Sequence, residues 1–190
     1  MNNRLIKIID RLISSNQYAF LKGRYILESV VAAHEIIHEV ARSWGEGVIL
    51  KLDYEKAYDK VCWDFLEEML TSRGFGAKWI SWVNCVVRGG SLSIRPNDED
   101  STYFKTGKGL RQGDPLSPLL FNLVADVFTK MLMKAGGAGL ISGLLPEICP
   151  GGVISLQYAD DTLLFLQNNL EKARNFKCIL SCFEQLSGWK

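Results

Sequence analysis

Two adjacent carboxylates, Asp160 and Asp161, separate two apolar segments within residues 153–166. Both segments are rich in residues that favour half-buried β-strands, so we expect a hairpin whose tight connection, around Ala159 and Asp160, carries both carboxylates. Neighbouring carboxylates repel each other, and a divalent cation would relieve that repulsion. An ordinary acidic turn is the alternative, because the pattern at residues 158–161 is too short to exclude it.

A third carboxylate, Asp53, ends a short β-type segment at residues 48–53. A strand that ends in an aspartate can hold the carboxylate rigidly, and Mg²⁺ needs that rigidity because its oxygen ligands must approach octahedral geometry. A strand-end or helix-capping aspartate is the alternative. On its own, Asp53 does not decide between a metal ligand and a structural residue.

A glycine-rich segment, residues 107–118, precedes a helix that we expect to run to about Ala135. Its glycines allow close approach of the backbone, and we expect Ser117 to cap the helix and Pro118 to occupy its first position. The free N–H groups at the start of this helix would suit a phosphate. A simple loop-to-helix junction is the alternative.

Other helices and strands must position these segments. From periodicity and breakers we expect helices at residues 5–14, 27–42, 63–87 with a break at Gly74 and Gly76, and 170–186, and strands at residues 91–95 and 102–106. Their apolar spacing predicts these inward residues: Leu5, Ile8, Ile9, Leu12, Leu27, Val30, Val31, His34, Ile37, Ala41, Trp79, Trp82, Leu170, Ala173, Phe176, Leu180 and Phe183. We interpret His34 as a core residue and not as a ligand.

The composition suits one globular domain or one and a half, because 47% of the 190 residues are hydrophobic and 23% are charged. The formal net charge of +1 gives no broad basic field, so any nucleic-acid contact must come from a local groove. The five cysteines show no zinc-binding spacing, and we expect reduced, mostly buried thiols. Without a membrane-length apolar run or a secretory signal, we expect an intracellular protein that contacts no membrane.

Three motifs together carry a resemblance that none carries alone. Residues 52–59, 109–118 and 158–161 resemble, in the family order, the three core palm motifs of reverse transcriptases. Residues 16–24, which combine aromatic and basic side chains, resemble the fingers motif of the LINE-type (non-LTR) retrotransposon enzymes, particularly the plant kind. The resemblance covers nearly the whole chain.

The resemblance implies an α+β fold of fingers and palm, with a small antiparallel sheet flanked by helices and with the thumb absent. We expect residues 1–47 to form a partial fingers segment and residues 48–190 to form the palm, with an inserted fingers hairpin at about 89–107. It also implies a single reverse transcriptase domain truncated at both ends, in which residues 188–190 only begin a lysine-bearing motif. We therefore expect poor processive synthesis.

The resemblance further implies DNA synthesis from deoxynucleoside triphosphates (dNTPs) on a primer 3′-hydroxyl, copied from an RNA or DNA template. Asp53 and Asp160 would hold two Mg²⁺ ions, which Mn²⁺ could replace, and Asp161 would complete or orient this catalytic metal site. Tyr58 would exclude the ribose 2′-hydroxyl, and Gln112 with Gly113 would border the incoming nucleotide.

The same resemblance makes Lys22, Arg24 and Arg111 candidates for contacts to phosphate or template. Two alternatives remain open at this stage. One is a non-catalytic remnant that binds nucleic acid or is inert, and the other is an unrelated ferredoxin-like metal-binding domain, which would need neither Tyr58 nor the Gln112–Gly113 pair.

Overall fold

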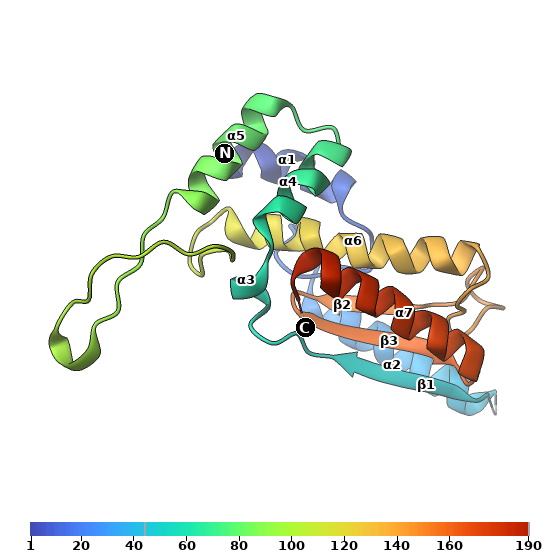
Figure 1. The fold of residues 1–190 in the computed structure, drawn as a ribbon. Coiled ribbons are helices and arrows are strands. Elements are labelled where there is room, and N and C mark those ends of the chain that lie inside the picture. The colour runs from blue at the N-terminus through green and yellow to red at the C-terminus, as the bar shows by residue number, and fades with distance from the viewer. Residues whose placement is uncertain (44, 190) are drawn as a thin grey trace.

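A sheet of three antiparallel strands lies at the centre of the part of the chain that the structure describes, residues 1–43 and 45–189 of a computed structural model. The strands are β1 (Gly47–Leu52), β2 (Ser155–Tyr158) and β3 (Asp161–Gln167). Their order is β1-β3-β2, so β3 is the central strand and β1 is an edge strand (Figure 1). The predicted β2–β3 hairpin and the predicted strand before Asp53 are both confirmed.

The helices are α1 (Asn2–Leu12), α2 (Ile26–Arg42), α3 (Ala57–Lys60), α4 (Trp63–Ser72), α5 (Ala77–Arg88), α6 (Ser117–Gly137) and α7 (Leu170–Ser187), with a short 3₁₀ turn η1 (Pro96–Asp98). Helices α6 and α7 pack on one face of the sheet and α2 packs on the other (Figure 1). The fold is therefore α+β with a small sheet flanked by helices, as the sequence predicts.

Strand β3 is apolar along its length because both of its faces are covered. Leu164 and Leu166 point into the core that α6 and α7 share, whereas Phe165 points into the smaller core beneath α2. Successive side chains of a strand alternate between the two faces, so a central strand covered on both sides needs a continuous apolar run. Edge strand β1 is exposed, including Val48 and Leu50.

Helix α6 is buried on almost every side, which explains why it is apolar around its circumference. Ser117 was predicted to cap this helix, and that prediction is wrong, because Ser117 lies inside the helix and Leu116 is the N-cap residue. The side chain of Asp114 accepts a hydrogen bond from the Leu116 N–H at 2.8 Å. Asp114, two residues before the N-cap residue, therefore supplies the side-chain acceptor at the start of the helix.

The predicted inward face of α2 is wrong. Ser29, Ala33 and Ile36 are its buried residues, whereas Leu27 is 69% exposed and Val31 is 58% exposed. Only a narrow stripe of this helix faces β2, so the apolar residues on either side of the stripe stay exposed. The other predicted inward residues of α2 that are exposed are Val30, His34, Ile37 and Ala41.

Other burial predictions fail in the same way, where a helix end or face reaches solvent. Ile8, Leu170 and Ala173 are exposed, and so is Trp82, whose ring centroid lies 5.4 Å from Lys78 Nζ.

The cysteines are free as predicted, but they are not mostly buried: Cys62 is half-buried and Cys85, Cys149, Cys178 and Cys182 are exposed.

The two strands predicted around residues 96–100 do not form within the described residues. Leu92 and Phe104 make one isolated antiparallel bridge, with reciprocal backbone hydrogen bonds of 2.8 Å. Residues 91–106 project from the rest of the molecule as a long loop with η1 at its tip (Figure 1). Side chains there find no second layer to bury them, so a longer ladder gains little.

A buried ion pair ties α6 to α1 and α4. The Asp126 carboxylate accepts a hydrogen bond from the Ser14 N–H at 2.7 Å and pairs with Arg73 Nη2 at 2.8 Å. Arg73 Nη1 also donates to the Leu12 carbonyl at 2.7 Å. Burial raises the pKa of Asp126, but hydrogen bonds from Ser14 and the Arg73 charge outweigh it, so the pKa is lowered. The end of α1 is thus fixed against α6.

Within residues 1–43 and 45–189, none of the helices combines the length and the apolar character that a membrane span requires.

Replacing Asp126 with Asn should destabilise the protein by about 3–5 kcal/mol at pH 7, because it leaves the Arg73 guanidinium buried without its counter-charge. Since the folded-state pKa is depressed, this stabilisation should persist above the ordinary aspartate value of 3.8 and disappear as the pH falls through the folded-state pKa. Urea unfolding between pH 3 and pH 7 measures both effects.

The matched control is Asp100→Asn, which removes an exposed aspartate that pairs with Arg95. That variant should unfold almost like the unaltered protein. Equal effects of the two substitutions would show that the buried pair contributes no more than the exposed one.

Candidate active site

The register of β1 on β3 brings the predicted carboxylates to one end of the sheet. Leu52 pairs with Thr162, so the next residue, Asp53, reaches the position opposite Asp161. Tyr158 pairs with Asp161 on the other side, and Asp160 lies in the connection between the hairpin strands. Residues far apart in the sequence therefore share one end of the sheet.

Asp161 has a partner that the sequence analysis did not foresee. Lys51 Nζ lies 2.8 Å from Asp161 Oδ1, and both side chains are more than half exposed. The pKa of Lys51 is raised, first by the hydrogen bond and charge of Asp161 and then by the charges of Asp53 and Asp160. All three carboxylates therefore act on one ammonium group.

The structure does not gather the three carboxylates into one cluster of metal ligands. In the described part of the chain, no group of three or more His, Cys, Asp or Glu side chains could hold a metal ion. Asp161 lines the α2 side of the sheet with Leu163, whereas the charge of Asp160 acts on Tyr58. Asp53 and Asp160 still offer the carboxylate oxygens that Mg²⁺ prefers. The metal assignment stays a prediction.

A buried glutamine that the sequence analysis missed holds the hairpin turn. Ala159 has a φ of 55°, a backbone conformation that needs support in a residue other than glycine. Gln17 is fully buried, and its Oε1 accepts hydrogen bonds from the Ala159 N–H at 3.2 Å and the Ala19 N–H at 2.9 Å. The turn that carries Asp160 is thus held by the predicted fingers segment.

This segment also lies along the edge of β2. The Tyr18 N–H donates to the Gln157 carbonyl at 2.9 Å, and the Gln157 N–H donates to the Asn16 carbonyl at 2.8 Å. Gln17, Ala19 and Leu21 are buried, while the residues between them are more exposed. The sequence itself does not alternate here, because Tyr18 and Phe20 are aromatic, so only the structure identifies Gln17 as an inward side chain.

Tyr58 lies on α3, and its ring is fixed by stacking. The ring is half-buried and lies parallel to Phe121, with centroids 4.4 Å apart and an interplanar angle of 4°. Burial, and then the negative charge of Asp160, raise the pKa of Tyr58 to about 12. The hydroxyl is therefore protonated near neutral pH, and it lies within the field of Asp160.

A tight contact at Gly109 joins the glycine-rich segment to α3. Gly109 has a φ of 97°, and a Cβ there would lie 2.8 Å from the Asp59 carbonyl, so the position requires glycine. Its N–H donates to the Val61 carbonyl at 2.8 Å, and its carbonyl accepts from Trp63 Nε1 at 2.7 Å. The segment that leads to Gln112 is thus anchored beside Tyr58.

Gln112 and Gly113 are exposed, and Gln112 lines a recess of about 530 Å³ with Lys108 and Arg111. Gly113 has a φ of 89°, and no atom lies within 4 Å of where a Cβ would stand. This part of the segment is open to a ligand.

The three predicted phosphate or template contacts differ in their surroundings. Lys22 is exposed, whereas Arg24 Nη1 donates to the carbonyls of Ser14 at 2.7 Å and Gln17 at 2.6 Å. Arg24 therefore holds the fold of the predicted fingers segment. The guanidinium of Arg111 packs against Gly90, where a Cβ would clash with it. The contacts of these residues to nucleic acid stay predictions.

Residues 1–189 match the family described as reverse transcriptase (RNA-dependent DNA polymerase). The chain belongs to the reverse transcriptase family. It is 27% identical over 175 residues to the 149 kDa transposon TX1 protein of Xenopus laevis, and this alignment covers 92% of the chain and 13% of that protein. It is 30% identical over 138 residues to the Pol polyprotein of the type-2 retrotransposable element R2DM of Drosophila melanogaster, which covers 70% of the chain and 12% of the polyprotein.

Both relatives confirm the predicted kinship of this chain with non-LTR retrotransposon proteins, and the chain spans only about an eighth of their length. The fold is similar to that of the telomerase of Candida albicans solved with a fragment of telomeric RNA. The two share a TM-score of 0.68 at 12% identity, over 98% of this chain and 32% of the other.

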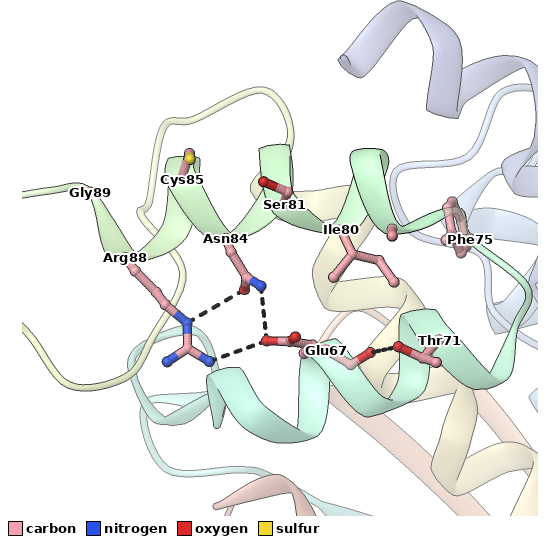
Figure 2. Close-up of a pocket in the computed structure, with 10 residues that line it drawn as sticks. Glu67, Thr71, Phe75, Ile80, Ser81, Asn84, Cys85, Arg88 and Gly89 are labelled. Carbon is pink, nitrogen blue, oxygen red and sulfur yellow. Dashed lines mark hydrogen bonds and ion pairs between the residues drawn. The ribbon is translucent and has the colours of Figure 1, made fainter.

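A recess of about 700 Å³ lies between α4 and α5 (Figure 2), and Asp53, Asp160 and Asp161 do not line it. Its polar groups satisfy each other: Asn84 Nδ2 donates to Glu67 Oε2 at 2.8 Å, and Arg88 pairs with Asp64 at 2.6 Å. Because these contacts join the two helices, we interpret the recess as structural despite its size.

Replacing Gln17 with Leu should loosen the hairpin turn, because the Ala159 and Ala19 amides lose their acceptor. Each unpaired buried N–H costs about 1–3 kcal/mol. Amide hydrogen exchange followed by NMR should show faster exchange at Ala159 than in the unaltered protein, while amides in the middle of α6 change less.

The control is Gln185→Leu on the exposed side of α7, which should leave exchange at Ala159 unchanged. Unaltered protection of Ala159 in the Gln17 variant would show that the turn does not depend on this side chain.

Proposed function

We propose that this chain performs the nucleotidyl transfer of a reverse transcriptase. The primer 3′-oxygen attacks the α-phosphorus of a dNTP, the bond to the pyrophosphate breaks, and the strand grows by one nucleotide copied from an RNA or DNA template. The observation that carries the proposal is that Asp53 and Asp160 share one end of the sheet beside Tyr58. Because the chain spans a small part of its relatives, the activity is proposed for the chain and not transferred from them.

Two carboxylates would hold the divalent cations, Asp53 at the end of β1 and Asp160 in the turn that Gln17 supports. When bound, Mg²⁺ lowers the pKa of the attacking hydroxyl and neutralises phosphate charge. Asp161 would orient the metal site, because its ion pair with Lys51 holds the ammonium group where the charges of Asp53, Asp160 and Asp161 all act on it. Rigid backbone supports for both metal-binding carboxylates favour this assignment.

Tyr58 would lie under the sugar of the incoming nucleotide and exclude a ribose 2′-hydroxyl by collision. Its ring is well suited to this role because stacking on Phe121 prevents it from moving aside. Gln112 and Gly113 would border the nucleotide from the glycine-rich segment, where backbone N–H groups can approach phosphate closely.

The template would contact exposed cationic side chains, including Lys22, and the recess lined by Lys108 and Arg111. The telomerase with a similar fold is bound to RNA in its structure, which supports an RNA template for this chain. The net charge of +1 predicts weak binding that falls with salt concentration.

Magnesium should raise the melting temperature of the unaltered chain, because an ion that binds only the folded form stabilises it by about 2.7 kcal/mol at 100 times its dissociation constant. In Asp160→Asn one repelling charge is gone, so this variant should melt at or above the unaltered chain in chelator and gain much less in millimolar Mg²⁺. Adding a dNTP should enlarge the difference, since its phosphates supply further ligands.

Asp98→Asn is the matched control, because Asp98 is exposed in the loop around η1. It should respond to magnesium like the unaltered chain. If Asp160 were only a turn residue, its replacement would lower the melting temperature in either buffer and the unaltered chain would ignore Mg²⁺ even with a dNTP, as expected for a non-catalytic remnant.

Replacing Tyr58 with Val should admit ribonucleotides, because the ring that collides with the 2′-hydroxyl is removed. We expect the preference for deoxynucleoside over ribonucleoside triphosphate to fall by at least about tenfold, or about 1.4 kcal/mol. Equilibrium binding to the chain in Mg²⁺, and single-nucleotide primer extension by a longer form that carries a thumb, measure this preference. Equal losses for both substrates would contradict the role of Tyr58.

A further inference from the structure

A column of aromatic rings lies behind Tyr58. Phe121 of α6, which is fully buried, stacks on Tyr58 and also on Trp189, with Phe121–Trp189 centroids 4.9 Å apart and an interplanar angle of 20°. Trp189 is itself fully buried against Tyr54, at a centroid distance of 4.7 Å, and Phe183, at 5.5 Å. Phe121 therefore links the Tyr58 ring to a residue that follows α7.

The turn that carries Trp189 is docked on the backbone just after α3. The Cys62 N–H donates to the Ser187 carbonyl at 2.9 Å. Gly188 has a φ of 83°, and a Cβ there would lie 2.8 Å from the Lys60 carbonyl, so only glycine permits this approach. The Trp189 N–H donates to Ser187 Oγ at 3.2 Å. The tryptophan is thus held by backbone contacts to the same segment that carries Tyr58.

Helix α3 cannot hold the Tyr58 ring by itself. It has four residues, fewer than a helix needs to be stable in isolation, so the ring position must come from packing. The parallel stack on Phe121 fixes the face of the ring, and Trp189 fills the space against which Phe121 rests. A smaller residue at 189 would let Phe121 relax, and Tyr58 would follow it.

We propose that Trp189 is a positioning residue for Tyr58. Acting through Phe121, it sets how closely the Tyr58 ring approaches the sugar of the incoming nucleotide, and so sets discrimination against ribonucleoside triphosphates. The inference rests on the proposed role of Tyr58 as the residue that excludes the 2′-hydroxyl. Trp189 itself would touch neither the nucleotide nor the carboxylates of Asp53, Asp160 and Asp161.

The test compares the preference for deoxynucleoside over ribonucleoside triphosphate, measured by equilibrium binding of both to the chain in Mg²⁺. Trp189→Leu should reduce this preference on the order of tenfold, because small displacements of a positioned group have effects of at least that size. Trp189→Phe keeps an aromatic ring in the column and should retain most of the preference. Phe121→Leu removes the direct partner of Tyr58 and should resemble Trp189→Leu.

Phe176→Leu is the matched control. Phe176 is buried and contacts Phe128 at 6.3 Å. It reaches Trp189 only through Phe128 and Phe183, so its loss costs core packing without removing a ring that contacts Tyr58, Phe121 or Trp189. It should lower the melting temperature but leave the preference unchanged. If the Trp189 and Phe176 variants weaken binding of both nucleotides equally, Trp189 is only a core residue and the proposal is wrong.

Tyr58→Val separates this inference from the proposed function. If that variant loses the preference and Trp189→Leu keeps it, the inference alone fails; if Tyr58→Val keeps it, the inference falls with the proposed role of Tyr58. If Trp189→Leu does not fold, the nucleotide preferences of Trp189→Phe and Phe121→Leu decide.

A second measurement needs no nucleotide: the NMR chemical shifts of the labelled Tyr58 ring. These shifts should change in Trp189→Leu and Phe121→Leu and stay the same in Phe176→Leu. An unmoved ring in the first two would overturn the proposal.

Discussion

The antiparallel pairing of β1 with β3 is the constraint on which the candidate site depends. It sets Leu52 opposite Thr162 and so brings Asp53 to the hairpin carboxylates. A slip of β3 by one residue would move Phe165 to the α6 side and Leu164 to the α2 side, so the two cores hold β3, and with it Asp160 and Asp161, in place. The apolar residues of β3 therefore fix the position of polar residues that they never touch.

Helix α6 is the platform that holds the remaining parts of the site. Three of its buried polar residues have helical spacing and face the predicted fingers segment: Asn122 Nδ2 donates to the Ala19 carbonyl at 2.6 Å, Asp126 binds Ser14, and Thr129 Oγ1 lies 3.4 Å from Asn16 Nδ2. On another side, Phe121 supports Tyr58. One helix thus positions the segment that supports the hairpin turn and also the ring beside that turn. Buried polar groups on an apolar helix are costly unless paired, so this stripe ties the helix to one partner segment.

The charged side chains of this molecule nearly cancel in sum, but some of them lie close together at the hairpin end of the sheet. The net charge is +1, yet three carboxylates act on Lys51 at the hairpin end of the sheet. Lys51 and Asp161 are both largely exposed, so their pair adds little to the free energy of unfolding. Strand alternation puts Asp161 on the α2 side of the sheet with Leu163, whereas the charge of Asp160 acts on Tyr58. Two adjacent residues in the sequence therefore have different surroundings.

The sequence by itself determined the elements and their motifs: the strand before Asp53, the hairpin at Asp160, the helices broken at Gly74 and Gly76, and the reverse transcriptase family, because periodicity, turn residues and motif order are local signals. Only the tertiary structure decided which neighbours those elements meet. Periodicity shows which residues of α2 share a face, but not how much of that face the sheet covers, so Leu27 was wrongly placed inside. The partners of Asp161, Ala159 and Phe121 are Lys51, Gln17 and Trp189, residues distant in sequence. Such pairs arise from strand register and helix packing, which no single stretch of sequence encodes.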